Sequence, residues 1–176
     1  MKIRNKSWRR ELCHVHAVGG IVFAATLAVI QILLWCVVGA PIGIFYLLRG
    51  VLPLLPRWLY MLCDLLIHAC LGAAFGMVLL DRRGVFEVQK YRGAFYFLLA
   101  ILMGYLYYAF FFGISFFLVS VVLAGLEFFG ILVAALNFTR INRLSVFLLF
   151  IGLLWAFYRF FFPSLPFLAY KKTQFS

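Results

Sequence analysis

The sequence predicts an all-α integral membrane protein, a bundle of about five transmembrane helices. Of the 176 residues, 67% are hydrophobic and only 12% are charged, a composition that soluble globular domains do not reach. Several apolar runs approach the roughly 20 residues that cross about 30 Å of hydrocarbon. The predicted spans are about 17–48, 58–80, 93–112, 115–138 and 145–162, between a basic N-terminal segment, 1–16, and a C-terminal tail, 163–176.

The first apolar run, 17–48, is too long for one upright helix, because its 32 residues would rise roughly 48 Å at 1.5 Å per residue. Pro41 lies between Gly39 and Gly43, where it removes a backbone donor and strains the preceding turn, so we expect a kink there. Either one kinked helix or a helix followed by a re-entrant or interfacial piece fits this run. The run exceeds the apolar core of a signal peptide, and we interpret it as a retained span.

The later connections are short or strongly polar. Residues 81–92 form the most polar stretch of the chain and must lie in water. The third and fourth spans are separated by little more than Gly113 and Ile114, which forces an antiparallel hairpin. Pro163 and Pro166 are expected to stop the last helix.

Basic residues predict the orientation of the bundle. Eleven of the 16 lysines and arginines fall in the N-terminal segment and in the second and fourth connections, which five spans place on one face. The positive-inside rule puts that face, with the N-terminal segment, in the cytoplasm. Arg159 is counted with the tail on the opposite face. The net charge of +11 is explained by anionic headgroups, so the expected partner is the lipid bilayer and not nucleic acid.

Asp64 and His68 are one helical turn apart inside the second apolar run. The carboxylate could accept a hydrogen bond from the imidazole, and either group could then relay a proton through a polar cavity. In the alternative that we favour, Asp64 lies near enough to the Trp58 end to face headgroup water, and His68 pairs with it.

Glu127 falls near the middle of the fourth span, where an unpaired carboxylate would cost a few kcal/mol. It should therefore face inward or carry a proton. The other strongly polar groups within the spans are Gln31, Asp64 and His68, so a hydrogen bond from Glu127 to one of them is the expected structural solution. A role for Glu127 in transport is the alternative.

Small residues recur at helical spacing and predict close helix–helix contacts. The pairs are Gly39 and Gly43, Gly72 and Gly76, and Ala100 and Gly104. These faces could pack within one chain, against a second copy, or against other membrane proteins.

The sequence presents no positive case for catalysis, because no Ser/His/Asp set combines membrane depth with plausible geometry. Cys13, His14 and His16 are possible metal ligands, but no second cluster at zinc spacing completes a tetrahedral set. We therefore expect no enzymatic activity, no metal and no cofactor.

The order of marked residues between 39 and 108 resembles the YabQ family of spore-cortex membrane proteins. The resembling pieces are Gly39-Ala40-Pro41-Ile42-Gly43-Ile44-Phe45-Tyr46-Leu47-Leu48-Arg49, Asp64-Leu65-Leu66, Gly84, Arg92-Gly93 and Gly104-Tyr105-Leu106-Tyr107-Tyr108. The resemblance implies a small non-enzymatic protein of endospore formation in a bacterial cell membrane, such as a forespore membrane. It would be needed for cortex assembly and would act through contacts with other sporulation membrane proteins or with copies of itself.

The chain also resembles, as the second choice, the TspO/MBR family of tryptophan-rich sensory proteins. Arg140-Ile141-Asn142-Arg143 and the later Leu153-Leu154-Trp155 look like that family's last connection and last helix. This resemblance implies a five-span protein that binds porphyrins or other apolar ligands. Gly104 and Tyr107 stand where the family has its ligand-site Asn and Trp, and the proline-rich first loop is reduced to Pro53 and Pro56.

Overall fold

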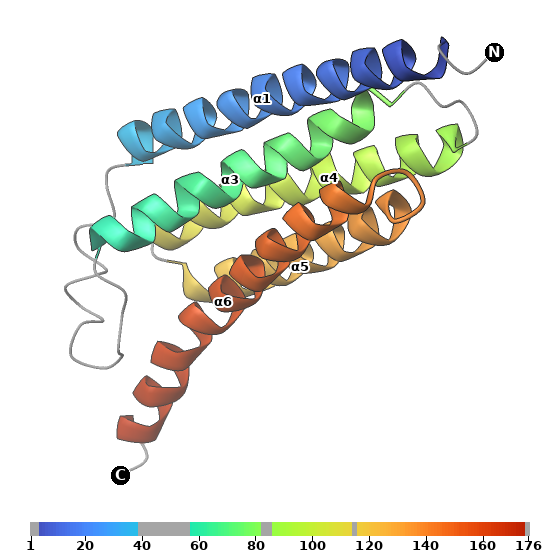
Figure 1. The fold of residues 1–176 in the computed structure, drawn as a ribbon. Helices are drawn as coiled ribbons and strands as arrows, with labels where there is room; N and C mark the ends of the chain where they lie inside the picture. The colour runs from blue at the N-terminus through green and yellow to red at the C-terminus, as the bar shows by residue number, and fades with distance from the viewer. Residues whose placement is uncertain (1–3, 39–56, 82–85, 114–115, 175–176) are drawn as a thin grey trace.

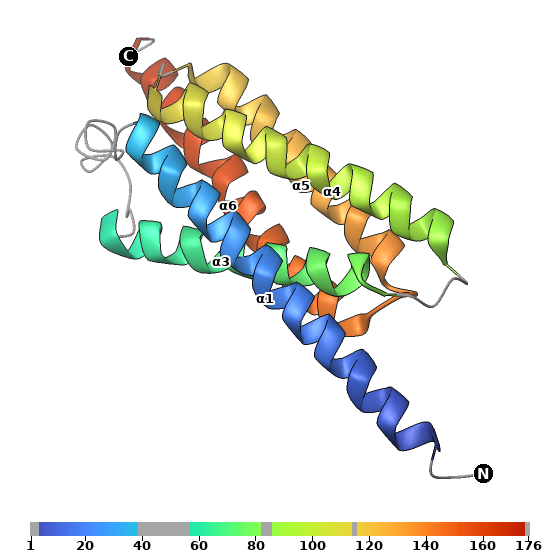
Figure 2. The same ribbon diagram turned by 90° about the horizontal axis from the view of Figure 1, so that it is seen from above.

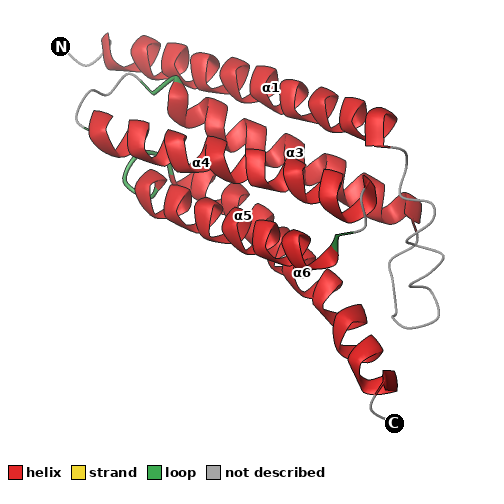
Figure 3. Cartoon of the chain, turned by 180° about the vertical axis from the view of Figure 1, so that it is seen from behind, coloured by secondary structure: helices red, strands yellow, loops and turns green. Residues whose placement is uncertain are grey.

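The computed structural model describes residues 4–38, 57–81, 86–113 and 116–174. These residues contain five helices that are long and apolar enough to cross a membrane, and Figure 3 shows only helices joined by loops among them. The helices are α1 (Arg4–Val38), α3 (Arg57–Leu79), α4 (Glu87–Tyr108), α5 (Phe117–Phe138) and α6 (Arg143–Gln174), with a π-helical segment, η1 (Ala109–Gly113), at the end of α4. The predicted all-α, multi-pass membrane fold is confirmed.

The helices pack in an order that differs from their order in the chain (Figure 1). Helix α1 packs on α3, α3 on α6, α6 on α5, and α5 on α4. The sequential helices α4 and α5 form the expected antiparallel hairpin, whose connection is tied by the Phe116 amide donating to the Phe110 carbonyl at 2.9 Å. As a result, α6 lies between α3 and α5 and brings its side chains to the middle of the bundle.

The contact between α1 and α3 depends on Gly72 and Gly76, as the small-residue pattern predicted. A Cβ atom at Gly72 would overlap the backbone of Phe23, and one at Gly76 would overlap the backbone of Gly19. The two helix backbones can approach this closely only because both positions lack a side chain. Gly39 and Gly43, the other predicted pair, lie outside the described residues.

We expect Gly72→Ala to lower the free energy of unfolding by about 1–3 kcal/mol, because its methyl group meets backbone atoms that cannot rotate away. The measurement is unfolding of the purified protein in mixed detergent micelles, followed by circular dichroism. Gly125→Ala is the matched control, since a Cβ there would stand 3.4 Å from the Phe160 ring. Equal losses in the two variants would contradict close α1–α3 packing.

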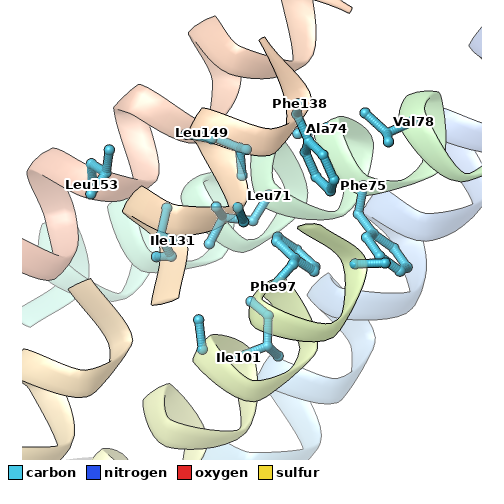
Figure 4. Packing of buried hydrophobic residues seen from close by; sticks show 14 of the residues in the cluster. Leu71, Ala74, Phe75, Val78, Phe97, Ile101, Ile131, Phe138, Leu149 and Leu153 are labelled. Atoms are coloured by element: carbon cyan, nitrogen blue, oxygen red, sulfur yellow. The ribbon is translucent and has the colours of Figure 1, made fainter. Parts of the chain in front are cut away.

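A hydrophobic core fills the space between α3, α4, α5 and α6 (Figure 4). The rings of Phe75 and Phe97 stack with centroids 4.7 Å apart, which joins α3 to α4. The other buried core residues include Leu71, Ala74, Ile101, Ile131, Phe138, Leu149 and Leu153. Large apolar side chains such as Val37 and Phe129 are instead exposed on the outside, as expected for a surface that faces lipid.

Two predicted boundaries are wrong. Helix α6 continues through Pro163 and Pro166 to Gln174, although each interior proline removes a backbone hydrogen bond and crowds the preceding turn. Figure 1 shows this last part of α6 extending away from the bundle. Helix α4 begins at Glu87, within the predicted connection. The apolar span of α1 begins at Ala17, as predicted, and the helix itself begins at Arg4, so the basic segment is helical and extends past the other helices (Figure 2). The expected kink at Pro41 lies outside the described residues.

Candidate functional site

Among the described residues, five that carry a charged, imidazole or amide side chain within the apolar spans are almost completely buried. Their side chains are between 0% and 2% exposed, and they come from four helices: Gln31 on α1, Asp64 and His68 on α3, Glu127 on α5 and Arg159 on α6. Four of them were singled out in the sequence. The fifth, Arg159, was not, because its place near the end of an apolar run suggested a side chain that reaches water.

Asp64 is held by two donors from two other helices. Gln31 Nε2 donates to Asp64 Oδ2 at 2.6 Å, and Trp155 Nε1 donates to Asp64 Oδ1 at 2.8 Å. Both oxygens of the Asp64 side chain therefore accept a hydrogen bond from a neighbouring helix. The interpretation that Asp64 faces headgroup water is wrong, since its side chain is 0% exposed.

His68 does not act as the main partner of the Asp64 carboxylate. Its Nδ1 donates to the backbone carbonyl of Asp64 at 2.8 Å and lies 3.6 Å from Asp64 Oδ1. The imidazole stacks on the Tyr105 ring with centroids 5.7 Å apart. His68 therefore lies at ion-pair distance from the carboxylate, as predicted, while the Trp155 indole and the Gln31 amide donate the hydrogen bonds that the carboxylate accepts.

Glu127 forms a buried ion pair with Arg159. Arg159 NH1 donates to Glu127 Oε1 at 3.0 Å, and Arg159 NH2 donates to the carbonyl of Gly104 at 2.8 Å. The prediction that Glu127 forms a hydrogen bond with Gln31, Asp64 or His68 is therefore wrong, because its partner is Arg159. An arginine inside an apolar run, opposite an unpaired acid at similar depth, is the signal in the sequence that could have identified this pair.

Gly104 makes room for the carboxylate of Glu127. A Cβ atom at this position would stand 2.7 Å from Glu127 Oε1, so any side chain would push the carboxylate away. The glycine was predicted as a packing residue. Gly104 does allow a close approach, but its nearest neighbour is the carboxylate of Glu127 and not the backbone of another helix. One turn earlier on the same face, Ala100 packs on Gly130 of α5.

Aromatic rings enclose the guanidinium and the indole. The guanidinium carbon of Arg159 lies 4.3 Å from the centroid of the Tyr107 ring and 4.7 Å from that of Tyr108. Such contacts stabilise a desolvated cation. The centroid of the Trp155 ring lies 5.1 Å from that of Tyr60 and 5.2 Å from that of Tyr158.

These buried polar residues and the rings around them form one cluster, which we call the polar centre. Its members are Gln31, Tyr60, Asp64, Gly104, Tyr107, Tyr108, Glu127, Trp155 and Arg159.

Several buried polar atoms in and beside the polar centre have no hydrogen-bond partner among the described residues. They are Gln31 Oε1, Trp35 Nε1, Tyr105 Oη, Tyr107 Oη, Glu127 Oε2 and Arg159 Nε. Unpaired polar atoms are costly in a low-dielectric interior, and native structures contain few of them. Four of these atoms, on Gln31, Tyr107, Glu127 and Arg159, belong to the polar centre itself, which makes it the candidate binding site of the molecule.

Few groups of the polar centre are of the kind that ligates metal ions. No group of three or more His, Cys, Asp and Glu among the described residues is placed to hold a metal ion. Its two carboxylates, Asp64 and Glu127, already accept hydrogen bonds from other side chains. The polar centre contains one buried cation, the Arg159 guanidinium, which lies against the faces of the Tyr107 and Tyr108 rings. It also contains polar atoms that have no hydrogen-bond partner among the described residues.

The comparisons with known proteins add no family to this description: no family model matches the chain, and no significant match exists among the curated proteins or the solved structures.

Proposed function

We propose that this chain is a non-enzymatic, multi-pass membrane protein whose polar centre binds a small, largely apolar ligand with polar groups. Porphyrins are the ligand class that the TspO/MBR resemblance implies. One observation carries the proposal. All five helices bring buried polar and aromatic side chains together at the polar centre, and several of the polar atoms there are unpaired. Gly104 and Tyr107 replace the ligand-site Asn and Trp of the TspO/MBR family, so that family's own contacts are not carried over.

The chemistry of the polar centre supports a ligand of this kind. Ligand pockets are mostly apolar and aromatic, with a few polar groups that fix orientation. Here the rings of Tyr60, Tyr107, Tyr108 and Trp155 supply the apolar surface. The unpartnered Tyr107 hydroxyl and Arg159 Nε supply directional donors.

We expect purified protein to bind protoporphyrin IX saturably, with quenching of tryptophan fluorescence. Tyr107→Ala should weaken this binding by about tenfold or more, since a buried aromatic contact of this size contributes on the order of 1–3 kcal/mol. Phe150→Ala is the matched control, because Phe150 is an exposed aromatic residue on the outside of α6. Quenching that rises linearly without saturation, or that is equal in both variants, would contradict the proposal.

A second candidate function is assembly of the spore cortex in a bacterial host, as the YabQ resemblance implies. The observation that favours it is the position of the resembling residues, since Asp64 and the Gly104–Tyr108 piece both contribute to the polar centre. On this hypothesis the polar centre is purely structural. The protein would sit in a forespore membrane and act through helix contacts with other sporulation proteins or with a second copy.

Deletion of the gene in its own host, followed by microscopy of sporulating cells, separates the two functions. Phase-grey spores without cortex, together with no saturable porphyrin binding, would favour cortex assembly. Normal spores, or a host that does not sporulate, would exclude it.

A further inference from the structure

Three exposed arginines lie at one end of the helix bundle. Arg92 is near the start of α4, and Arg140 and Arg143 lie on either side of the turn between α5 and α6. All three residues are exposed. Figures 1 and 3 show the start of α4 beside this turn, at the same end of the bundle. We call Arg92, Arg140 and Arg143 the arginine cluster.

Packing and hydrogen bonds hold the backbone of the arginine cluster in place. A Cβ atom at Gly93 would overlap the ring of Phe138 and stand 3.0 Å from Asn137 Cβ, so the start of α4 lies directly on the end of α5. The amides of Ile141 and Asn142 both donate to the Phe138 carbonyl, at 2.9 and 3.0 Å. The turn that carries Arg140 and Arg143 is therefore kept next to the start of α4.

The positive charge of the arginine cluster has no neutralising partner among the described residues, because no described carboxylate forms an ion pair with it. Glu87 is exposed and lies five residues before Arg92, which puts it roughly 140° around α4 from that arginine. Guanidinium groups bind phosphate oxygens through paired donors. The arginine cluster therefore fits a phosphate group.

Large apolar side chains lie one helical turn from the arginines, on the membrane side. Each arginine is three or four residues from an apolar residue that is between 62% and 64% exposed and belongs to a membrane span. Residues at this spacing share one face of a helix. A soluble anion would use only the cations, whereas a lipid would use both parts of this surface. The pairs are Arg92 and Phe95, Arg140 and Leu136, and Arg143 and Phe147.

We propose that the arginine cluster binds the phosphate headgroup of an anionic membrane lipid, whose acyl chains lie against Phe95, Leu136 and Phe147. This site differs from the general attraction between a basic face and anionic headgroups, which depends on charge alone. It depends on guanidinium geometry as well, since a lysine presents only a point charge to phosphate. The site lies at the end of the bundle and does not depend on ligand binding in the polar centre.

Dioleoyl phosphatidylglycerol and dioleoyl phosphatidylcholine form the probe pair, because they share their acyl chains and differ in headgroup charge. The whole chain is reconstituted in phosphatidylcholine nanodiscs that contain increasing fractions of phosphatidylglycerol. Native mass spectrometry then counts the lipids that stay bound after release into detergent. We expect saturable retention of phosphatidylglycerol, preferred about tenfold or more over phosphatidylcholine, as three nearby arginines would produce.

Two sets of variants separate guanidinium geometry from charge. Arg92→Gln, Arg140→Gln and Arg143→Gln together should lower the preference for phosphatidylglycerol about tenfold. Lysine at the same three positions keeps the charge, and it should still lower the preference at least threefold, to about the level of diffuse attraction. The matched control changes three arginines of the basic N-terminal segment to lysine and should keep the wild-type preference. These control positions are Arg4, Arg9 and Arg10.

Four results would overturn the lipid site. They are equal retention of the two lipids by the wild-type protein, a wild-type preference in the lysine variant of the arginine cluster, an equal loss in the control, and displacement of phosphatidylglycerol by millimolar inorganic phosphate. The last result would show a site for soluble anions, in which the apolar side chains take no part. All the substitutions in the arginine cluster are at exposed positions, and an unchanged circular dichroism spectrum verifies that each variant is folded.

Discussion

Replacing Arg159 with methionine is expected to lower the free energy of unfolding by about 3–5 kcal/mol, the cost of leaving a buried charge without its partner. In this variant Glu127 loses its counter-ion, and the Gly104 carbonyl loses its donor. The measurement is unfolding in mixed detergent micelles, with abundance in the membrane as a second readout. Arg140→Met, at an exposed position, should change stability by less than about 0.5 kcal/mol.

A double-mutant cycle separates the ion pair from general packing. Combining Arg159→Met with Glu127→Gln removes both charges, so the double variant should regain at least half of the stability that Arg159→Met loses. Additive losses would show that Glu127 and Arg159 do not interact energetically. In that case the contact at 3.0 Å would not be what positions α6 against α5.

Asp64→Leu should be the second most destabilising change, by about 2–4 kcal/mol, because it leaves two buried donors unsatisfied at roughly 1–3 kcal/mol each. These donors are Gln31 Nε2 and Trp155 Nε1. Asp64→Asn should fall between leucine and wild type, since its amide has one acceptor oxygen for two donors.

His68→Leu discriminates between the two ways of pairing Asp64. In the structure the imidazole bonds to a backbone carbonyl that also belongs to the α-helix, so its loss should cost less than the loss of Asp64. Thermal unfolding of the two leucine variants under the same conditions makes the comparison. If His68→Leu were the more damaging change, the pairing of the carboxylate with Gln31 and Trp155 would be wrong.

The fold could be predicted from the sequence because lipid imposes a simple rule on composition. Runs of about 20 apolar residues must be helices in a bilayer, and the short connection at Gly113 leaves α4 and α5 no arrangement other than a hairpin. The contact at Gly72 and Gly76 was predictable as well, since small residues one turn apart mark close helix packing. Helix ends were less predictable, because the water-exposed turns that extend a span carry no apolar signal.

The partners in the polar centre could not be predicted, because they depend on which helices are neighbours in space. Trp155 and Asp64 are 91 residues apart, and no local pattern indicates that α6 lies beside α3. Distance from the end of an apolar run was also a poor guide to depth. It placed Arg159 and Asp64 near water, but both are 0% exposed, since side chains of neighbouring helices cover them.

The ionisation state of Glu127 tests the buried ion pair most directly. The measurement is the infrared difference spectrum between the wild-type protein and Glu127→Gln. The wild-type protein should show the stretching bands of an ionised carboxylate, as expected for the counter-ion of Arg159. The carbonyl band of a protonated acid in their place would contradict the ion pair.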